Sequence, residues 1–255
     1  MHARFNENSF LRPIPNDRFT LKPPVNYKLT RLQVLHDGKN SSHGVSITNP
    51  ENKITIMYFG GNMFTIEKNG KQIVDVLTQL NVNVVIFDHR GYGQSTGVPT
   101  VALLQSDAID NYDYIRKRQS GKIILHGQSL GSFEAGAVAE HRKIDALTLE
   151  SSATNIDDWI KKVMPWYIKA VTKTEISEEL RLLNNKRVVS QFTKPLMILV
   201  GKKDKQTPVK LSEELFSYAI SENKKLHILE GSSHNNVPIN PEFLSIYQKF
   251  INGIM

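Results

Sequence analysis

The chain has no cysteine and no long apolar run, and both absences narrow what it can be. Without cysteine there is no disulfide, no thiolate nucleophile and no thiolate metal site, and cysteine usage does not indicate a redox compartment. No stretch approaches the roughly 18 consecutive apolar residues of a membrane-spanning helix. The first ten residues also lack the apolar core of a signal peptide. The sequence favours a cytoplasmic location and leaves open a signal or anchor upstream of it.

No large block of one charge is present either. The 255 residues are 40% hydrophobic and 22% charged, with a formal net charge of +7. These values are ordinary for one globular α/β domain with a full core. The basic pairs at 161–162, 202–203 and 224–225 are scattered, which gives nucleic-acid binding little support. The net positive charge suits solubility, and it also allows an anionic substrate or peripheral contact with a membrane surface. Nothing indicates the oligomeric state.

Apolar strands that alternate with helices predict the fold class. Residues 1–30 carry four prolines and few periodic apolar positions, so we expect an extended N-terminal arm. A hairpin then joins residues 31–36 to 44–48. Further strands are expected at 54–59, 82–88, 122–126, 144–149, 195–200 and 226–229, with helices between them. This pattern predicts an α/β fold over residues 31–255, with a mostly parallel central sheet of about eight strands and helices on both faces.

One segment interrupts the alternation. Residues 154–192 separate two predicted strands and contain both tryptophans of the chain, Trp159 and Trp166. Other apolar residues there, such as Tyr167 and Ile168, are spread over more than one helix face. We expect a small helical lid over the ends of the strands. An ordinary long crossover helix is the alternative.

The sequence G-Q-S-L-G at residues 127–131 is the centre of the chain's chemistry. It follows the apolar strand at 122–126 and precedes a helix-forming stretch, S-F-E-A-G-A-V-A. G-x-S-x-G is common in turns, but between a strand and a helix it is typical of a nucleophile elbow. The sharp turn lifts the Ser129 hydroxyl out of the sheet, and the glycines let strand and helix approach each other. Ser129 is therefore the candidate nucleophile.

A serine nucleophile needs a base, and the base needs an orienting acid. In hydrolases of this architecture the order is Ser, then Asp or Glu, then His. Asp204 follows the strand at 195–200, and His234 follows the last strand. Both would lie at the carboxyl edge of the sheet, where open α/β sheets place their sites. Ser129, Asp204 and His234 are therefore the predicted catalytic residues.

The remaining histidines and one aspartate are weaker candidates. His89 is the one serious rival base, because it follows a strand that ends near the same edge. Asp88 is the rival acid, but its strand precedes the elbow, which places it badly for a histidine near the end of the chain. His126 adjoins the motif and is expected to be buried in its strand.

An oxyanion intermediate needs two N–H donors. The backbone N–H of Leu130, directly after the nucleophile, is the first candidate. The second should come from the loop after the strand at 54–59, where Gly60 and Gly61 allow close backbone approach. We expect Asn62 to supply it, with Met63 as its neighbour.

Together these motifs resemble the α/β-hydrolase superfamily over residues 27–252, and within it the lysophospholipase-like and depalmitoylase-like serine hydrolases. The segment D-H-R-G-Y-G-Q-S-T-G at 88–97 matches D-x-R-G-x-G-x-S-x-G. The elbow matches G-x-S-L-G, and Gly201 to Pro208 matches G-x-x-D-x-x-x-P. The chain departs at Gly60, where the family usually has histidine before Gly-Asn. The motifs specify the fold strongly and the substrate weakly.

The resemblance implies a cofactor-free serine hydrolase with no metal site. Ser129 would attack the carbonyl of an ester or thioester, possibly one derived from an acyl lipid, and an acyl-enzyme would form. Two alternatives stay open. A serine peptidase of the same fold would need an acid to hold an amine, for which Glu150 is the candidate. A non-catalytic binding protein on this fold would be inert toward a fluorophosphonate.

Overall fold

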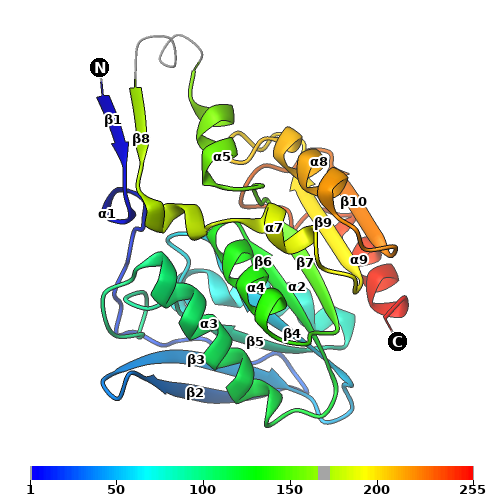
Figure 1. The fold of residues 1–255 in the computed structure, drawn as a ribbon. Helices are drawn as coiled ribbons and strands as arrows, with labels where there is room; N and C mark the ends of the chain where they lie inside the picture. The colour runs from blue at the N-terminus through cyan, green and yellow to red at the C-terminus, as the bar shows by residue number, and fades with distance from the viewer. Residues whose placement is uncertain (1, 166–172, 255) are drawn as a thin grey trace.

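The core of the fold is an eight-stranded sheet with helices on both faces (Figure 1). The computed structural model describes residues 2–165 and 173–254. The strand order is β10-β9-β7-β6-β4-β5-β3-β2. Strands β4 to β10 of this sheet pair in parallel, whereas β3 pairs antiparallel with both β2 and β5. The mostly parallel α/β fold predicted from the sequence is confirmed.

The strands of the main sheet fall at the expected places. They are β2 (Lys28–His36), β3 (Asn40–Thr48), β4 (Ile54–Phe59), β5 (Asn83–Phe87), β6 (Lys122–Gln128), β7 (Ala146–Glu150), β9 (Leu196–Gly201) and β10 (Lys224–Leu229). The hairpin strands β2 and β3 are longer than predicted, because they pair along their whole length. Much of β2 is solvent-exposed, so its outer residues give little hydrophobic signal.

The helices that cover the sheet divide between its two faces. They are η1 (Ile66–Gly70), α2 (Lys71–Leu77), η2 (Thr78–Leu80), α3 (Val101–Arg116), α4 (Leu130–His141), α8 (Val209–Tyr218) and α9 (Phe243–Asn252). The first of these is a π-helical turn. Apolar side chains of α2 and α9 pack on one face of the sheet, and those of α3, α4 and α8 on the other.

Alternation along the buried strands supplies both cores. In β4, Ile56 and Tyr58 belong to the cluster under α2 and α9, whereas Met57 and Phe59 belong to the cluster under α3 and α4. All six residues of β4 are buried. A strand covered on both faces needs apolar residues at every position, which explains the continuous apolar runs of the sequence.

A second, two-stranded sheet lies beyond the carboxyl ends of the main strands (Figure 1). In it β1 (His2–Phe5) pairs in parallel with β8 (Lys173–Ile176). The neighbouring parts of the chain form α1 (Glu7–Phe10), α5 (Ile156–Val163), η3 (Glu178–Leu182) and α7 (Asn185–Val189). Of these, α7 packs against α4 and α8 on the main sheet. The segment expected to be helical thus contains a strand as well as helices. Trp166, Tyr167 and Ile168 lie outside the described residues.

The N-terminal segment and the 154–192 segment share one apolar cluster. Leu11 from the first packs with Leu130 and Phe133 of α4 and with Ile156 and Ile160 of α5, and Phe10 adjoins this cluster. The rings of Phe10 and Trp159 meet edge to face at 5.8 Å between centroids. Two segments that are far apart in the sequence therefore pack together beside the nucleophile elbow.

Candidate active site

Ser129 occupies a strained turn between β6 and α4. Its φ of 52° and ψ of −116° lie where non-glycine residues rarely occur. Its N–H donates to the carbonyl oxygen of Glu150 at 2.9 Å, which ties the turn to the end of β7. A Cβ on Gly127 would lie 2.4 Å from Gly131 O, and one on Gly131 would lie 2.3 Å from Gly60 O. Both glycines of the motif are thus required by close backbone packing.

The structure brings the three predicted catalytic side chains into one hydrogen-bonded row. His234 Nε2 lies 3.0 Å from Ser129 Oγ, and His234 Nδ1 lies 2.9 Å from Asp204 Oδ2. The three residues come from the ends of β6, β9 and β10, respectively. Asp204 and His234 are both buried, which shields their contact from water. A histidine so placed can accept a proton from the serine while the carboxylate fixes its orientation.

Thr207 joins this row and was not predicted. Its hydroxyl lies 2.8 Å from Asp204 Oδ2 and 3.2 Å from His234 Nδ1. The backbone N–H groups of Gln206 and Thr207 donate to Asp204 Oδ1. Burial alone raises the pKa of Asp204, but its contacts with His234 and Thr207 outweigh burial, so the pKa lies below its ordinary value. The signal available in the sequence was the spacing, since Asp side chains often cap N–H groups two and three residues on.

The loop after β4 passes directly beside the nucleophile. A Cβ on Gly61 would lie 3.3 Å from Ser129 Cβ, so the Gly61–Asn62 backbone runs past the reacting hydroxyl. Leu130 opens α4, and the first N–H groups of a helix have no intrahelical acceptor. Both predicted oxyanion donors, Leu130 and Asn62, therefore lie on backbone next to Ser129.

The Asn62 side chain anchors the N-terminal segment. Its Oδ1 accepts from Tyr92 Oη at 2.8 Å and from the N–H of Arg12 at 3.1 Å. Its Nδ2 donates to the carbonyl of Phe10 at 2.7 Å. The N-terminal segment thus holds the loop that carries a candidate oxyanion donor, a link between residues about fifty positions apart that no local pattern encodes.

His89, the rival base, is engaged elsewhere. Its Nδ1 lies 2.8 Å from Glu134 Oε1, and its Nε2 lies 3.0 Å from the carbonyl of Gly60. Burial opposes protonation of His89, but the charge of Glu134 and the two contacts outweigh it and raise its pKa. At Gly60, where the family usually has histidine, a Cβ would lie 2.1 Å from the Phe64 ring. His89 therefore binds the backbone of the loop after β4, and Phe64 fills the space beside Gly60.

Asp88, the rival acid, is buried away from His234. Its carboxylate accepts from the N–H groups of Ile66 at 2.8 Å and Gln94 at 3.3 Å. Burial raises the pKa of Asp88 to about 6, although these two N–H groups and the charge of His89 act in the opposite direction. The Asp88 carboxylate thus links the start of η1 to the loop after β5 through hydrogen bonds.

The raised pKa of Asp88 predicts how the stability of the protein depends on pH. The folded state holds the Asp88 proton more tightly than the unfolded chain, whose aspartate pKa is about 3.9. The contribution of Asp88 to the free energy of unfolding is therefore present below pH 4 and falls as the pH rises to about 6. Between pH 4 and pH 7 the free energy of unfolding of wild type should fall by about 2 kcal/mol relative to that of Asp88→Asn.

Urea unfolding of both proteins at several pH values measures this loss. Asp17→Asn, at an exposed aspartate, is the matched control and should run parallel to wild type. Parallel curves for wild type and Asp88→Asn would contradict the prediction.

Two cavities of about 440 Å³ each open beside Ser129 and His234. One has a mainly apolar wall, formed by Phe5, Phe10, Leu130, Phe133, Ala153, Ile156 and Trp159. The other, which we call the polar cavity, has polar and apolar surface in similar amounts, and its polar residues include Lys68, Asn69, Gln72, Gln128, Glu150 and Asn235. Both contain Ser129 and His234, so a substrate that spans the two would pass its central bond over the candidate nucleophile.

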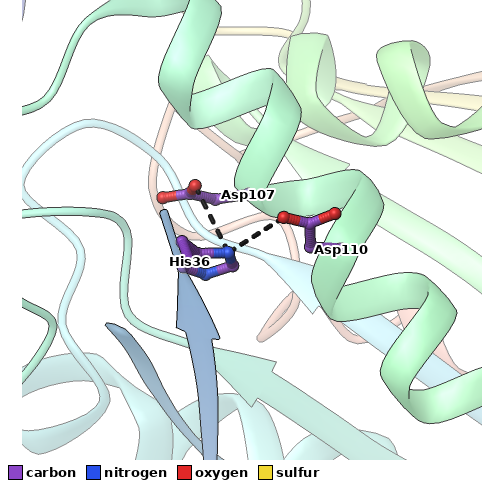
Figure 2. A group of neighbouring side chains, drawn as sticks. All are labelled: His36, Asp107 and Asp110. Atoms are coloured by element: carbon purple, nitrogen blue, oxygen red, sulfur yellow. Dashed lines mark hydrogen bonds and ion pairs between the residues drawn. The ribbon is translucent and has the colours of Figure 1, made fainter. Parts of the chain in front are cut away.

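Over the part of the chain that the structure describes, one cluster has the spacing of a metal site. Its members are His36, Asp107 and Asp110 (Figure 2). Arg90 already binds both oxygens of Asp107, at 2.8 and 2.7 Å, and His36 Nε2 contacts Ser42 Oγ at 2.8 Å. The Arg90–Asp107 ion pair and the contacts of His36 therefore already engage this cluster, and the His36 contacts join β2 to α3.

Comparison with known proteins places the chain in a family. It belongs to the hydrolase family described as "Serine aminopeptidase, S33", whose model matches residues 53–188. That match contains the elbow and ends before Asp204 and His234. Protein bem46 of Schizosaccharomyces pombe is 29% identical over 212 residues, covering 79% of this chain and 68% of that protein. Lysophosphatidylserine lipase ABHD12 of Macaca fascicularis is 27% identical over 220 residues, covering 77% and 55%. The chain thus spans about half to two thirds of these relatives.

Solved structures confirm the fold. The esterase Pf2001 of Pyrococcus furiosus superposes with a TM-score of 0.77 at 19% identity, covering 96% of this chain and 98% of that one. The chain is therefore an α/β-hydrolase, an enzyme of the lysophospholipase-like type that its motifs predicted. In the described ranges no helix has the length and apolar character needed to cross a membrane.

Proposed function

We propose that the chain hydrolyses carboxylic esters or thioesters, including esters of acyl-lipid origin, through an acyl-enzyme on Ser129. The observation that carries the proposal is the row Ser129–His234–Asp204, with contacts of 3.0 and 2.9 Å. The names of its relatives, a lysophosphatidylserine lipase and an esterase among them, support ester chemistry. The substrate class belongs to this proposal too, because the chain spans only part of the length of these relatives.

The proposed reaction has two halves. His234 Nε2 takes the Ser129 proton while Oγ attacks the carbonyl carbon, and the proton then passes to the leaving alcohol or thiol as the acyl-enzyme forms. Water attacks the acyl-enzyme by the same route and releases the acid. Asp204 holds the histidine with Nδ1 protonated and stabilises its positive form. The N–H groups of Leu130 and Asn62 would stabilise the oxyanion, each by about 3 kcal/mol.

The apolar cavity suits the acyl chain. Its wall combines residues of the N-terminal segment, such as Phe5 and Phe10, with Ile156 and Trp159 of α5. We propose that residues 1–30 act as an arm and residues 154–192 as a lid, and that together they enclose the acyl chain. Trp159 is anchored there, because its indole N–H donates to the Gln206 carbonyl at 2.7 Å.

Hydrolysis of p-nitrophenyl esters from acetate to palmitate tests the proposal. We expect turnover with an optimum beyond acetate. Absence of turnover across the series would contradict ester hydrolysis and favour the peptidase alternative, for which the family description is the supporting observation. Aminoacyl p-nitroanilides are the substrates that would reveal a peptidase.

Phe10→Ala tests the acyl assignment of the apolar cavity. The change removes a ring that faces both the cavity and Trp159. We expect kcat/KM for octanoate esters to fall about tenfold, because roughly 1.4 kcal/mol of apolar contact is lost, while that for acetate changes little. Val25→Ala in the same segment, at a side chain that is 87% exposed, is the matched control. An equal loss on both esters would show that Phe10 acts on the loop and not on the acyl chain.

A further inference from the structure

One of the residues that line the polar cavity beside Ser129 is a buried acid. Glu150 is the last residue of β7 and has no exposed surface. It lines the cavity together with Tyr58, Gln128, Ser129 and His234. Its backbone carbonyl accepts the N–H of Ser129, so its place relative to the nucleophile is set by the sheet itself.

Of the two oxygens of this carboxylate, one has a hydrogen-bond partner among residues 2–165 and 173–254. Glu150 Oε2 lies 2.9 Å from His126 Nε2, and His126 Nδ1 lies 3.3 Å from Tyr247 Oη. Glu150 Oε1 is buried and has no hydrogen-bond partner in the part of the chain that the structure describes. A buried carboxylate oxygen without a donor is costly, so a ligand that supplies a donor there would gain a strong contact.

The charges around the cavity favour a cation at this point. Among the described residues that line it, Glu150 is the one acid, and the one lysine, Lys68, is exposed. The other polar groups of the wall, among them Gln128 and Asn69, are neutral amides. The negative charge of Glu150 is also felt by Tyr58, whose pKa is raised by burial first and by this carboxylate second.

We propose that this cavity binds the leaving alcohol of the substrate and that Glu150 Oε1 accepts a hydrogen bond from an ammonium group on that alcohol. The inference rests on the proposed function, since it assumes that the acyl chain occupies the apolar cavity. The substrate class is then an ester of an amino alcohol. On attack, the Ser129 Oγ–acyl bond forms, the acyl–oxygen bond to the alcohol breaks, and His234 Nε2–H protonates the departing oxygen.

Two esters of one acid test the proposal. Dimethylaminoethyl octanoate and isoamyl octanoate have nearly the same shape, but only the first carries an ammonium group at neutral pH. Both form the same acyl-enzyme, so deacylation cancels when their kcat/KM values are compared. We expect wild type to prefer the ammonium ester by about tenfold, the size of one charge-assisted hydrogen bond. In Glu150→Gln the ratio should fall close to one.

The matched control is Glu51→Gln, at an exposed glutamate before β4, at the opposite end of that strand from the site. It should keep the wild-type ratio. The readout is a ratio, so a general loss of activity in Glu150→Gln does not affect it. A wild-type ratio near one, or an unchanged ratio in Glu150→Gln, would overturn the proposal.

A second measurement uses wild type alone and does not depend on the variant folding. Dimethylaminoethanol should inhibit p-nitrophenyl octanoate hydrolysis at about tenfold lower concentration than isoamyl alcohol. Equal inhibition by the two alcohols would overturn the inference. Hydrolysis of p-nitrophenyl octanoate would still support the proposed function in that case. If wild type hydrolyses none of the esters, the proposed function fails, and the inference fails with it.

Discussion

Ser129→Ala is expected to abolish ester hydrolysis, with kcat falling roughly ten-thousand-fold or more. The methyl group cannot form the acyl-enzyme, and His234 then has no nucleophile to deprotonate at its Nε2, which now lies 3.0 Å from the serine oxygen. The fold should persist, because the Ser129 side chain makes no capping bond to α4. Removal of the side chain also leaves the N–H bond to Glu150 in place.

Two measurements check this expectation. The first is p-nitrophenyl octanoate turnover, and the second is covalent labelling by a fluorophosphonate with the modified residue identified by mass spectrometry. Ser217→Ala, at an exposed serine on α8, is the matched control and should behave as wild type. Turnover that survives in Ser129→Ala, or a label on a different serine, would remove Ser129 as the nucleophile.

Asp204→Asn is expected to lower kcat by about ten-thousand-fold with little change in KM. The amide can donate to His234 Nδ1, which would place the histidine proton on Nε2 and leave no base facing Ser129. The three donors now directed at the carboxylate, from Gln206 and Thr207, should hold the amide in nearly the same position. The loss would therefore be chemical rather than structural.

The pH dependence of Asp204 adds a stability test of the same contact. Its folded-state pKa lies below the ordinary value, so its contribution to stability is present above the unfolded-state pKa of about 3.9 and is lost as the pH falls. Asp75→Asn, at a half-buried aspartate paired with Lys71, is the control for both readouts. A loss of activity below tenfold in Asp204→Asn would show that this carboxylate does not orient His234.

Prediction from the sequence worked where the signal was local. Hydrophobic runs located the central strands of the main sheet, because strands buried on both faces must be apolar throughout, as β4 is. The exposed strand β2 was located by alternation and was predicted too short. The G-x-S-x-G spacing located the elbow, because the strand, the turn and the helix that give the motif its meaning are adjacent in the sequence. Gly127 also packs against Gly131 within the motif, whereas Gly131 packs against Gly60 at the end of another strand. The order of Ser129, Asp204 and His234 selected three side chains that the structure brings within hydrogen-bond distance.

Prediction failed where the contact joins segments with no shared pattern. Thr207 could have been found from its spacing after Asp204, but its contact with His234 depends on how β9 and β10 lie together. Nothing in the sequence pairs His89 with Glu134. The π-helical turn at η1 was also missed, since its apolar positions resemble those of an ordinary helix.

The sequence by itself determined the class of this protein: an α/β-hydrolase whose sheet, elbow and strand-end loops follow from periodicity and short motifs. Only the tertiary structure decided what surrounds the reacting serine. It packed the N-terminal segment onto α5 to form the apolar cavity and tied Asn62 to Phe10 and Arg12. It also left one oxygen of Glu150 without a donor from the described residues. Each of these depends on residues dozens of positions apart, whose proximity arises from packing and not from any local spacing.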